Sequence, residues 1–579
     1  MKNKNIKILK YSVGVIISIM FLSACKKSFL ERPPIDAIVD ASFYKTDEQV
    51  MASTSLLYSR VWFDYNDQAS YNLGDFRAGT AFSAYNDRGN VEFNTTDLTP
   101  ANANAWHSFY NVIGQANLAI ANINRYGGAA VSADVKKTAI AEARFMRALA
   151  YRFLTMNWGE VPIIENNLDY LKDPTVTKNT SKSVWRFITR EMRAASADLP
   201  ETPSAVGRLS KWSAEGMLAR FYLTRAGVES TGGSRSQVFL DSAKYYSQRV
   251  INMSGKTLLP DYANLFKFPY DNNQESLFEL QWVFLPGNDG YGAGNSNPSY
   301  FNYSSDISVE GWGGDKAATY WMLGQYEGFT ASGDTMISGR TLDQRLKATF
   351  MLPGANYPEI TQSVAATGTV PAHDQKLIFP NNVNASVSFA SIKKYVVGKG
   401  TDIGYPTLTA QRYPNNTYML RLAEMYLIYA DAALGNSSTT SDPTALAYFN
   451  KVHTRAGLPA YADLISGAPL PLTLDVLMSE KFKEFAMEAT AWYDIVSLQY
   501  WNPQKAYEIL NSQDRGYYYI TPNTFPNPSS WVIKKTPWAN PSNGNLRKIN
   551  ASSGNFLLPL PSAEKTQAPW LLKPAVDYP

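Results

Sequence analysis

The segment Ala139–Trp158 (AIAEARFMRALAYRFLTMNW) carries the strongest helical pattern in the chain. Its large apolar residues recur every three or four positions, as one face of an α-helix requires: Phe145, Leu149, Phe153 and Met156. The alanines between them have small side chains, which allow a neighbouring helix to approach closely. Gly159 and Pro162 follow and predict the end of the helix. The segment therefore predicts one member of a closely packed set of helices.

Segments with similar periodicity occur on both sides of this helix. We predict further helices at Ala41–Val61, about 106–127, Ser183–Leu199, Ser210–Ala226, Asp241–Ile251, Tyr418–Leu434, Pro443–Ala456 and Leu474–Tyr500. Ala445 and Phe449 have the A-x3-F spacing of a tetratricopeptide repeat, in a degenerate form. The predicted fold is mainly α, with tetratricopeptide-like helical hairpins that form an irregular right-handed stack.

Two stretches lack this periodicity. Residues 62–99 are rich in Asn, Asp, Gly and aromatics, and residues 256–416 are rich in Gly, Pro, Asn, Ser and aromatics, with a strand-like run at Ser276–Trp282. Long loops of this kind often carry binding sites. We therefore predict a single domain over 25–579. It consists of a helical frame (about 36–255 and 417–505), a large loop-rich ligand lobe with short strands (about 256–416) and an extended tail (506–579).

The composition is that of a folded protein with an unusual aromatic content. Hydrophobic residues make up 45% and charged residues 18%. The net charge is +4 and the basic residues are scattered along the chain, whereas nucleic-acid binding needs a clustered basic face. Aromatic residues reach 13%, with 36 Tyr and 13 Trp. Such rings suit a wet surface that stacks on flat, hydroxylated ligands.

The N-terminus has the pattern of a lipoprotein signal peptide. Four lysines precede an apolar run, Tyr11–Leu22, which is too short to span a bilayer of about 30 Å. Ser23 and Ala24 are small, and Cys25 is the only cysteine in the chain. We predict a signal peptide over 1–24 and lipidation of Cys25, with an ordinary signal peptide beside an unmodified cysteine as the alternative.

The sequence lacks the common catalytic and cofactor motifs. His107, His373 and His453 are isolated, and no H-E-x-x-H, G-x-x-x-x-G-K-[ST] or G-x-S-x-G pattern occurs. We expect no catalytic residues, no metal site and no cofactor. A hidden glycoside hydrolase stays an alternative, because its two carboxylates need no fixed sequence spacing.

The chain resembles the SusD/RagB family of outer-membrane nutrient-binding lipoproteins over nearly all of its length. Its opening pieces, FLERPP and SFYKTDEQV, look like the beginning of that family. Four helical segments and the closing segment look like family signatures: Trp106–Ile123, Ala141–Ile164, Gly207–Ala226, Arg421–Ala432 and FLLPLPSAE at 556–564.

This resemblance implies a non-catalytic, lipid-anchored protein on the outside of the outer membrane. It would act as the lid of a SusC-like TonB-dependent transporter, capture oligosaccharides and hand them over. In the family the helices mostly face the transporter and the loop-rich lobe carries the ligand surface. Two alternatives stay open: capture of peptides by the same architecture, and a helical scaffold that binds only protein.

The sequence departs from the family pattern in two places. Ala489, Ala491 and Ser497 stand where the family commonly has a glycine and two arginines, although the acidic residues of that segment are kept: Glu480, Glu484, Glu488 and Asp494. The fold prediction stands, but the local ion pairs are left open. Lys26 and Lys27 follow Cys25 without acidic residues, so placement on the inner leaflet also stays open.

Two loop segments combine the aromatic faces and polar groups that a sugar site needs. The ligand-binding candidates are Tyr71, Asp75, Arg77, Tyr85 and Asn86 in the first segment, and Tyr291, Asn295, Tyr300, Tyr303, Trp312 and Trp321 in the second. The alternative for each residue is internal packing of the lobe. For the tryptophans on helical stripes, packing is the prediction: Trp106, Trp158, Trp185 and Trp492.

Overall fold

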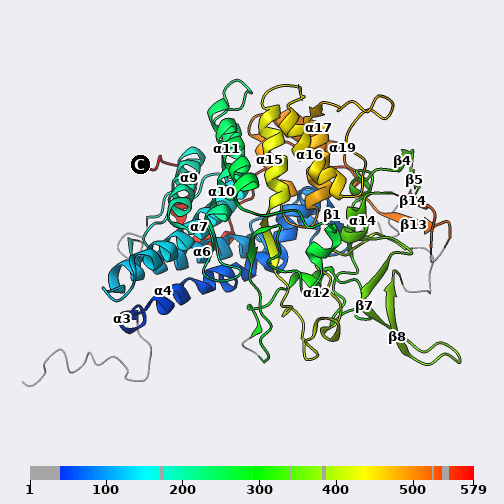
Figure 1. Cartoon of the computed structure of the whole chain (residues 1–579), viewed down its shortest axis with the longest axis horizontal. Coiled ribbons are helices and arrows are strands. Elements are labelled where there is room, and N and C mark those ends of the chain that lie inside the picture. Colours follow the sequence, from blue (N-terminus) through cyan, green and yellow to red (C-terminus); the bar gives the residue numbers. More distant parts are fainter. Residues whose placement is uncertain are drawn as a thin grey trace, which may run out of the picture.

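A computed structural model describes residues 40–169, 175–287, 290–339, 341–380, 387–524, 527–536 and 547–579. Cys25 and the predicted signal peptide lie outside these ranges. Figure 1 shows the long helices on one side and in the middle of the molecule, with most of the strands on the other side. One continuous core of buried side chains runs from Leu57 to Leu571 and includes both regions.

The prediction of a mainly helical fold is confirmed. The long helices are α6 (Pro100–Tyr126), α7 (Ala133–Trp158), α9 (Ser181–Asp198), α10 (Lys211–Val228), α11 (Gln237–Met253), α15 (Leu422–Leu434), α16 (Pro443–Arg455), α17 (Leu474–Phe485), α18 (Ala491–Gln499) and α19 (Pro503–Ser512). Each helix from α6 to α11 packs on the next, α11 packs on α15, and α15 packs on α16 and α17. The four tryptophans on helical stripes are buried, as predicted. The tetratricopeptide-like detail stays a prediction.

The helix predicted first is α7, and its ends follow from local chemistry. The Ser132 side chain accepts a hydrogen bond from the Val135 N–H and caps the first turn. Gly159, with φ of 74°, ends the helix in a backbone conformation that favours glycine. Ala141, Ala143 and Ala148 are fully buried, and α7 packs against both α6 and α9. Small buried side chains of this kind allow helices to approach closely.

Three of the predicted helices are divided in the structure. The first consists of α3 (Asp40–Phe43), α4 (Asp47–Ser53) and the 3-10 turns η1 (Ser55–Tyr58) and η2 (Arg60–Trp62), because Thr46 and Gln49 form a capping box that starts a new helix. Tyr418–Leu434 begins with strand β10 (Thr417–Arg421). Leu474–Tyr500 forms α17 and α18, separated by residues 486–490.

Residues 62–99 form a compact, mostly buried coil instead of long surface loops. The coil contains two irregular helical turns, η3 (Tyr65–Ala69) and η4 (Asn72–Phe76), then strand β1 (Ala81–Ser83) and helix α5 (Arg88–Glu92). Leu73, Phe76 and Ala78 are fully buried. The Gly, Asn and Asp content of this segment therefore serves tight backbone packing rather than exposure.

The strands form small antiparallel sheets. The first contains β1, β3 (Lys316–Ala318), β9 (Ser391–Ile392) and β6 (Phe350–Met351), in that order. The second contains β13 (Tyr518–Pro522), β14 (Trp531–Lys535), β5 (Thr335–Ser338) and β4 (Phe329–Ser332). Three pairs complete the set: β10 with β2 (Ser276–Leu280), β7 (Asn356–Val364) with β8 (His373–Ile378), and β11 (Thr439–Thr440) with β12 (Leu472–Thr473).

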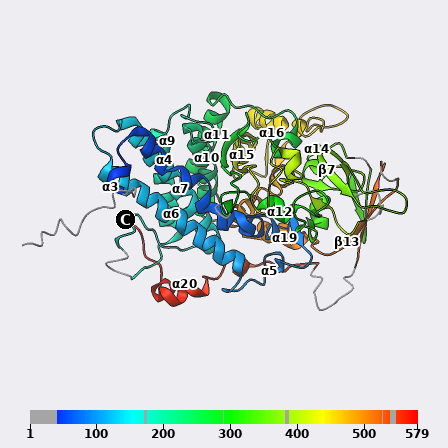
Figure 2. The ribbon, with the colours of Figure 1, turned by 90° about the horizontal axis from the view of Figure 1, so that it is seen from below.

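Short helices connect the strands and complete the C-terminal region. They are α12 (Asn297–Phe301), α13 (Tyr320–Leu323), α14 (Gln344–Thr349), α20 (Ser562–Gln567) and the 3-10 turns η5 (Tyr262–Phe266), η7 (Gly400–Ile403), η9 (Ser553–Asn555) and η10 (Pro569–Leu572). Residues 506–579, predicted to be an extended tail, thus contain most of α19, the β13–β14 hairpin and α20, and α20 projects below α6 in Figure 2.

A buried network of ion pairs connects the helices to the lobe. Arg421 at the end of β10 donates to Glu275, Glu484 and Glu488 at 2.7 to 2.8 Å. Arg455 of α16 also pairs with Glu275 and Glu484, and Arg345 of α14 pairs with Glu480 and Glu484. The local ion pairs that the sequence left open therefore exist, with arginines from β10, α14 and α16.

Residues 486–490 between α17 and α18 adopt a strained backbone. Met487 and Ala489 have φ of 65° and 56°, in the left-handed region that favours glycine. The Asp75 carboxylate accepts hydrogen bonds from both of their N–H groups, at 2.7 and 2.9 Å. Gly74 lies directly against this backbone, since a Cβ at Gly74 would come within 2.3 Å of the Ala489 Cα. Ala489 is also the position where the family commonly has glycine.

We predict that Ala489→Gly stabilises the protein by about 0.5–1 kcal/mol. The left-handed conformation costs a non-glycine residue about 1–2 kcal/mol, and this relief exceeds the entropy that glycine gains in the unfolded chain. Urea unfolding followed by tryptophan fluorescence measures the change. The control is Ala121→Gly, at an exposed position inside α6, which should destabilise by about 1 kcal/mol. A destabilised Ala489→Gly variant would contradict the argument.

Candidate functional site

The pairing of β1 with β3 places the two predicted loop segments side by side. Phe82 pairs with Ala317 and Ser83 with Lys316, although about 230 residues separate the strands in the sequence. The ladder extends one step further, because the Ala84 N–H donates to the Asp315 carbonyl at 2.7 Å. The residues that follow β1 and precede β3 therefore meet at one edge of the lobe.

Asp315 fixes the turn that follows β1. Its Oδ2 accepts hydrogen bonds from the Ser83 hydroxyl at 2.6 Å and the Asn86 N–H at 3.2 Å, while its Oδ1 accepts one from Lys316 at 2.9 Å. Burial raises the pKa of the Asp315 carboxyl, but the Lys316 ammonium and these hydrogen bonds outweigh it and leave the pKa below its ordinary value. An ionised Asp315 thus holds Asn86 and the adjacent, exposed Tyr85 in place.

Trp312 and Tyr300 form an aromatic pair in front of β3. Their ring centroids are 5.4 Å apart and the planes are tilted by 54°. Trp312 is 45% exposed and Tyr300 is half-buried beneath it. The Tyr300 hydroxyl accepts hydrogen bonds from the side-chain amides of Gln68 at 2.7 Å and Gln411 at 2.9 Å, which fix the ring orientation.

Tyr291 adds a third exposed ring. It projects from a loop closed by the hydrogen bond from the Val283 N–H to the Ala293 carbonyl, and its ring packs edge-on against Phe63 at 5.0 Å. Burial, followed by the nearby carboxylates of Asp67 and Asp64, raises the pKa of Tyr291. We refer to Tyr85, Tyr291, Tyr300 and Trp312 as the aromatic surface.

Asp67 lies beside Tyr300, in a kink of the chain. Gln68, with φ of 71°, breaks the irregular turn η3 and aims these two side chains toward Tyr300 and Gln411. Asp67 Oδ1 accepts a hydrogen bond from Gln411 Nε2 at 3.0 Å. Burial is the main cause that raises the pKa of Asp67 to about 6. Asp67 is therefore ionised at neutral pH, as a partly buried acceptor next to the aromatic surface.

Four of the candidates chosen from the sequence are buried and have internal partners. Asp75 holds residues 487–489, and Arg77 lies 4.1 Å over the Trp492 ring and donates to the Asn555 carbonyl at 2.6 Å. Burial lowers the pKa of Arg77 to about 9. Asn295 donates to the Asn415 carbonyl at 2.8 Å, and Tyr71 packs against Phe76 and Phe301. These four shape the lobe from inside.

Two further candidates from the second segment lie outside the aromatic surface. Trp321 is half-buried against Phe482 of α17, with ring centroids 5.3 Å apart. Tyr303 packs edge-on against Phe379 at 5.0 Å. Conversely, sequence reasoning missed Asp67, Gln68 and Gln411. The first two lie in the polar run DYNDQAS just before the chosen segment, while no local pattern marks Gln411, which folding brings to Tyr300 from 111 residues away.

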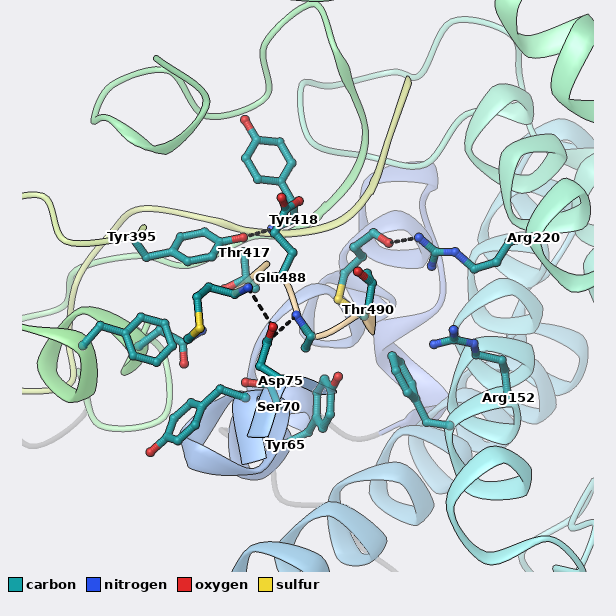
Figure 3. Close-up of a pocket in the computed structure, with 17 residues that line it drawn as sticks. Tyr65, Ser70, Asp75, Arg152, Arg220, Tyr395, Thr417, Tyr418, Glu488 and Thr490 are labelled. Atoms are coloured by element: carbon teal, nitrogen blue, oxygen red, sulfur yellow. Dashed lines mark hydrogen bonds between the residues drawn. The ribbon is translucent and has the colours of Figure 1, made fainter. Parts of the chain in front are cut away.

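The cavity shown in Figure 3 is internal and is not a sugar site. Its volume of about 20 Å³ gives room for about one water molecule. Buried polar side chains line it, among them Asp75, Arg152, Arg220 and Glu488. The described part of the chain also brings together no group of three His, Cys, Asp or Glu side chains that could hold a metal ion. We base the proposed function on the aromatic surface, because its exposed rings and polar groups meet at the β1–β3 edge.

The described chain thus combines a helical frame with an exposed aromatic and polar surface. Comparison with known proteins gives the family. Residues 274–573 match the family described as "SusD family", and residues 44–223 match "Starch-binding associating with outer membrane". The chain is 33% identical over 579 residues to a SusD-like protein of Bacteroides ovatus, with 96% of each chain covered. The protein therefore belongs to the SusD family.

Solved structures agree with this assignment. A crystal structure with a xylogluco-oligosaccharide has 32% identity and a TM-score of 0.76, covering 92% of this chain and 99% of the other. Surface glycan-binding protein A from Bacteroides thetaiotaomicron, in complex with laminarihexaose, has 18% identity and a TM-score of 0.64, covering 91% and 99%. The second likeness concerns the fold alone. Within the described ranges, no helix combines the length and apolarity that a membrane span requires.

We predict that Asp67→Asn becomes increasingly stabilising as the pH rises from 4 to 7. The ordinary pKa of this carboxyl is 3.8 and the folded value is about 6, so between these values the folded wild type binds the additional proton. Wild-type stability therefore falls as the pH rises through this window, by about 1–3 kcal/mol, and the amide does not share this loss.

Urea unfolding of both proteins at pH 4, 5, 6, 7 and 8 measures this difference. Asp198→Asn, at an exposed position at the end of α9, gives the background effect of losing one carboxylate. A wild type that gains stability relative to Asp67→Asn between pH 4 and 7 would contradict the assigned burial of this carboxylate.

Proposed function

We propose that this protein captures oligosaccharides on the aromatic surface and delivers them to a TonB-dependent outer-membrane transporter without cleaving them. The observation that carries the proposal is the β1–β3 pairing, which brings Tyr85 and Asn86 together with Trp312 and Tyr300. Exposed rings match the apolar faces of sugar rings, and the neighbouring amides and carboxylate match the hydroxyls.

Weak binding is sufficient for this role. A dissociation constant of about 1 mM corresponds to about −4.1 kcal/mol, which one or two ring stacks and a few hydrogen bonds supply. Gln68, Gln411 and Asp67 already fix one another and the Tyr300 hydroxyl, so a ligand would not have to order them. Support for a glycan ligand comes from the relative of 32% identity whose structure contains a xylogluco-oligosaccharide.

The transporter partner and the membrane anchor rest on the sequence. The resemblance to SusD/RagB lipoproteins implies a SusC-like partner, and Cys25 is the predicted site of the acyl anchor. An anchored binder would hold a weakly bound oligosaccharide beside the transporter at a high effective concentration. We propose that the anchored protein faces outward from the outer membrane, as the lid of that transporter.

We predict that the mature protein with Cys25 replaced by serine binds a neutral oligosaccharide and leaves it intact. Isothermal titration calorimetry against xylogluco-oligosaccharides, laminarihexaose and short peptides measures binding, and a reducing-end assay over 24 h measures cleavage. Reducing ends that appear with time would support the hidden hydrolase instead. Binding of peptides alone would support the peptide alternative.

We predict that Trp312→Ala weakens oligosaccharide binding by about tenfold or more, because it removes a stacking face worth at least about 1.4 kcal/mol. The matched control is Trp570→Ala. Trp570 is 43% exposed, close to the 45% of Trp312, but it lies on η10 beside α20 and away from α12 (Figure 2). Equal loss of affinity in both variants would argue against the aromatic surface. Tyr71→Ala is unsuitable for this test, because Tyr71 is buried and its removal alters packing.

A further inference from the structure

Carboxylates outnumber basic side chains around the aromatic surface. Six carboxylates lie on the segments that carry it or are bonded to residues of those segments: Asp64, Asp67, Asp87, Glu92, Glu310 and Asp315. Burial raises the pKa of Tyr300 and of Tyr291, and nearby carboxylates raise it further: Asp67 and Asp87 for Tyr300, Asp67 and Asp64 for Tyr291. These carboxylates therefore lie close to the rings that would contact a ligand.

The basic side chains in the same region already pair with carboxylates or carbonyl groups of the same chain. Lys316 has only 3% of its side chain exposed and lies 2.9 Å from Asp315 and 3.9 Å from Asp87. Arg88 of α5 donates to Glu92 and to the Ala84 carbonyl. Arg412 donates to the Gly287 carbonyl. An anionic ligand would therefore meet paired or carbonyl-bound cations.

The negative charge is partly open to solvent. Asp64 has 45% of its side chain exposed and accepts a hydrogen bond from His107, which is 70% exposed. Asp67 is half-buried and accepts a hydrogen bond from the side-chain amide of Gln411. A carboxylate or sulfate on a bound sugar would lie within several ångströms of these groups, where like charges repel even across water.

We propose that the aromatic surface selects neutral oligosaccharides and excludes glycans that carry carboxylate or sulfate groups. The inference rests on the proposed function and specifies its ligand class. The aromatic rings alone would stack on a uronic acid as readily as on a neutral sugar, so the rejection comes from the surrounding carboxylates. This selection is electrostatic and depends on ionic strength, because the screening length falls from about 10 Å at 0.1 M salt to about 3 Å at 1 M.

The test compares the binding of one oligosaccharide in a neutral form and in a negatively charged form. The probes are a galactosylated xylogluco-oligosaccharide and the same oligosaccharide with the galactose C6 hydroxyl oxidised to a carboxylate. At pH 7.5 and 0.1 M salt we expect the carboxylated probe to bind at least about fivefold more weakly than the neutral probe. At 1 M salt the ratio should fall below about twofold, whereas a purely steric effect of oxidation would keep the ratio constant.

A variant with two carboxylates neutralised tests whether the weaker binding of the carboxylated probe comes from charge repulsion rather than from steric contact. Asp64→Asn with Glu92→Gln removes two negative charges and leaves the rings in place, so it should raise affinity for the carboxylated probe about threefold and change affinity for the neutral probe less than twofold. The control is Glu48→Gln with Asp198→Asn, on α4 and α9 at the far side of the helices from α12 (Figure 1). It removes the same charge and should change neither affinity.

The outcomes distinguish this inference from the function on which it rests. If neither probe nor any other neutral oligosaccharide binds, the proposed function fails. If the neutral probe binds and the carboxylated probe binds equally or more tightly at 0.1 M salt, the function stands and the charge selection is overturned. A ratio that does not change with salt, or a charge variant that behaves as its control, also overturns it.

Discussion

The fold depends on one buried guanidinium, that of Arg421. It connects the end of β10 with Glu275 before β2, Glu484 on α17 and Glu488 in the following loop. Burial opposes ionisation of Glu484 and Glu488, but the surrounding cations outweigh it and lower the pKa of both. Buried charges destabilise a fold unless each has its partners. Removal of one partner leaves an uncompensated buried charge and lowers the stability by about 3–5 kcal/mol. The network therefore fixes the position of the helices relative to the lobe.

The aromatic surface is connected to this network through a short series of contacts. Glu488 lies in the strained loop between α17 and α18, and Asp75 accepts hydrogen bonds from the residues on either side of it. Asp75 also accepts one from Thr80, directly before β1, and β1 pairs with the strand that carries Lys316. A polar site on irregular backbone is thus supported by buried charges and strands rather than by loop residues alone, and this preorganisation limits the entropy lost on binding.

The sequence predicts the helices well because their periodicity is local. Phe145, Leu149 and Phe153 identify α7 without knowledge of any partner. The sequence predicts the site less well, because segments distant in the chain determine which side chains of residues 62–99 are buried. Asp75 and Arg77 look like ligand contacts in a polar loop, yet residues 487–489 and 555 enclose them. Ala489 shows the same limit, since only the structure reveals its left-handed backbone. Their place in polar, aromatic loop segments indicates Tyr85, Tyr291 and Trp312 as candidates, and the structure leaves these three side chains exposed.

The β1–β3 pairing has a consequence for biogenesis. The residues that would meet a ligand come from positions 67 to 411, so their assembly depends on contacts between segments that are synthesised far apart in time. Fragments or partly folded chains would present the rings separately, with no common face. Under the proposed function, ligand capture requires the fully assembled molecule, and a single oligosaccharide titration would report on the completeness of folding across most of the chain.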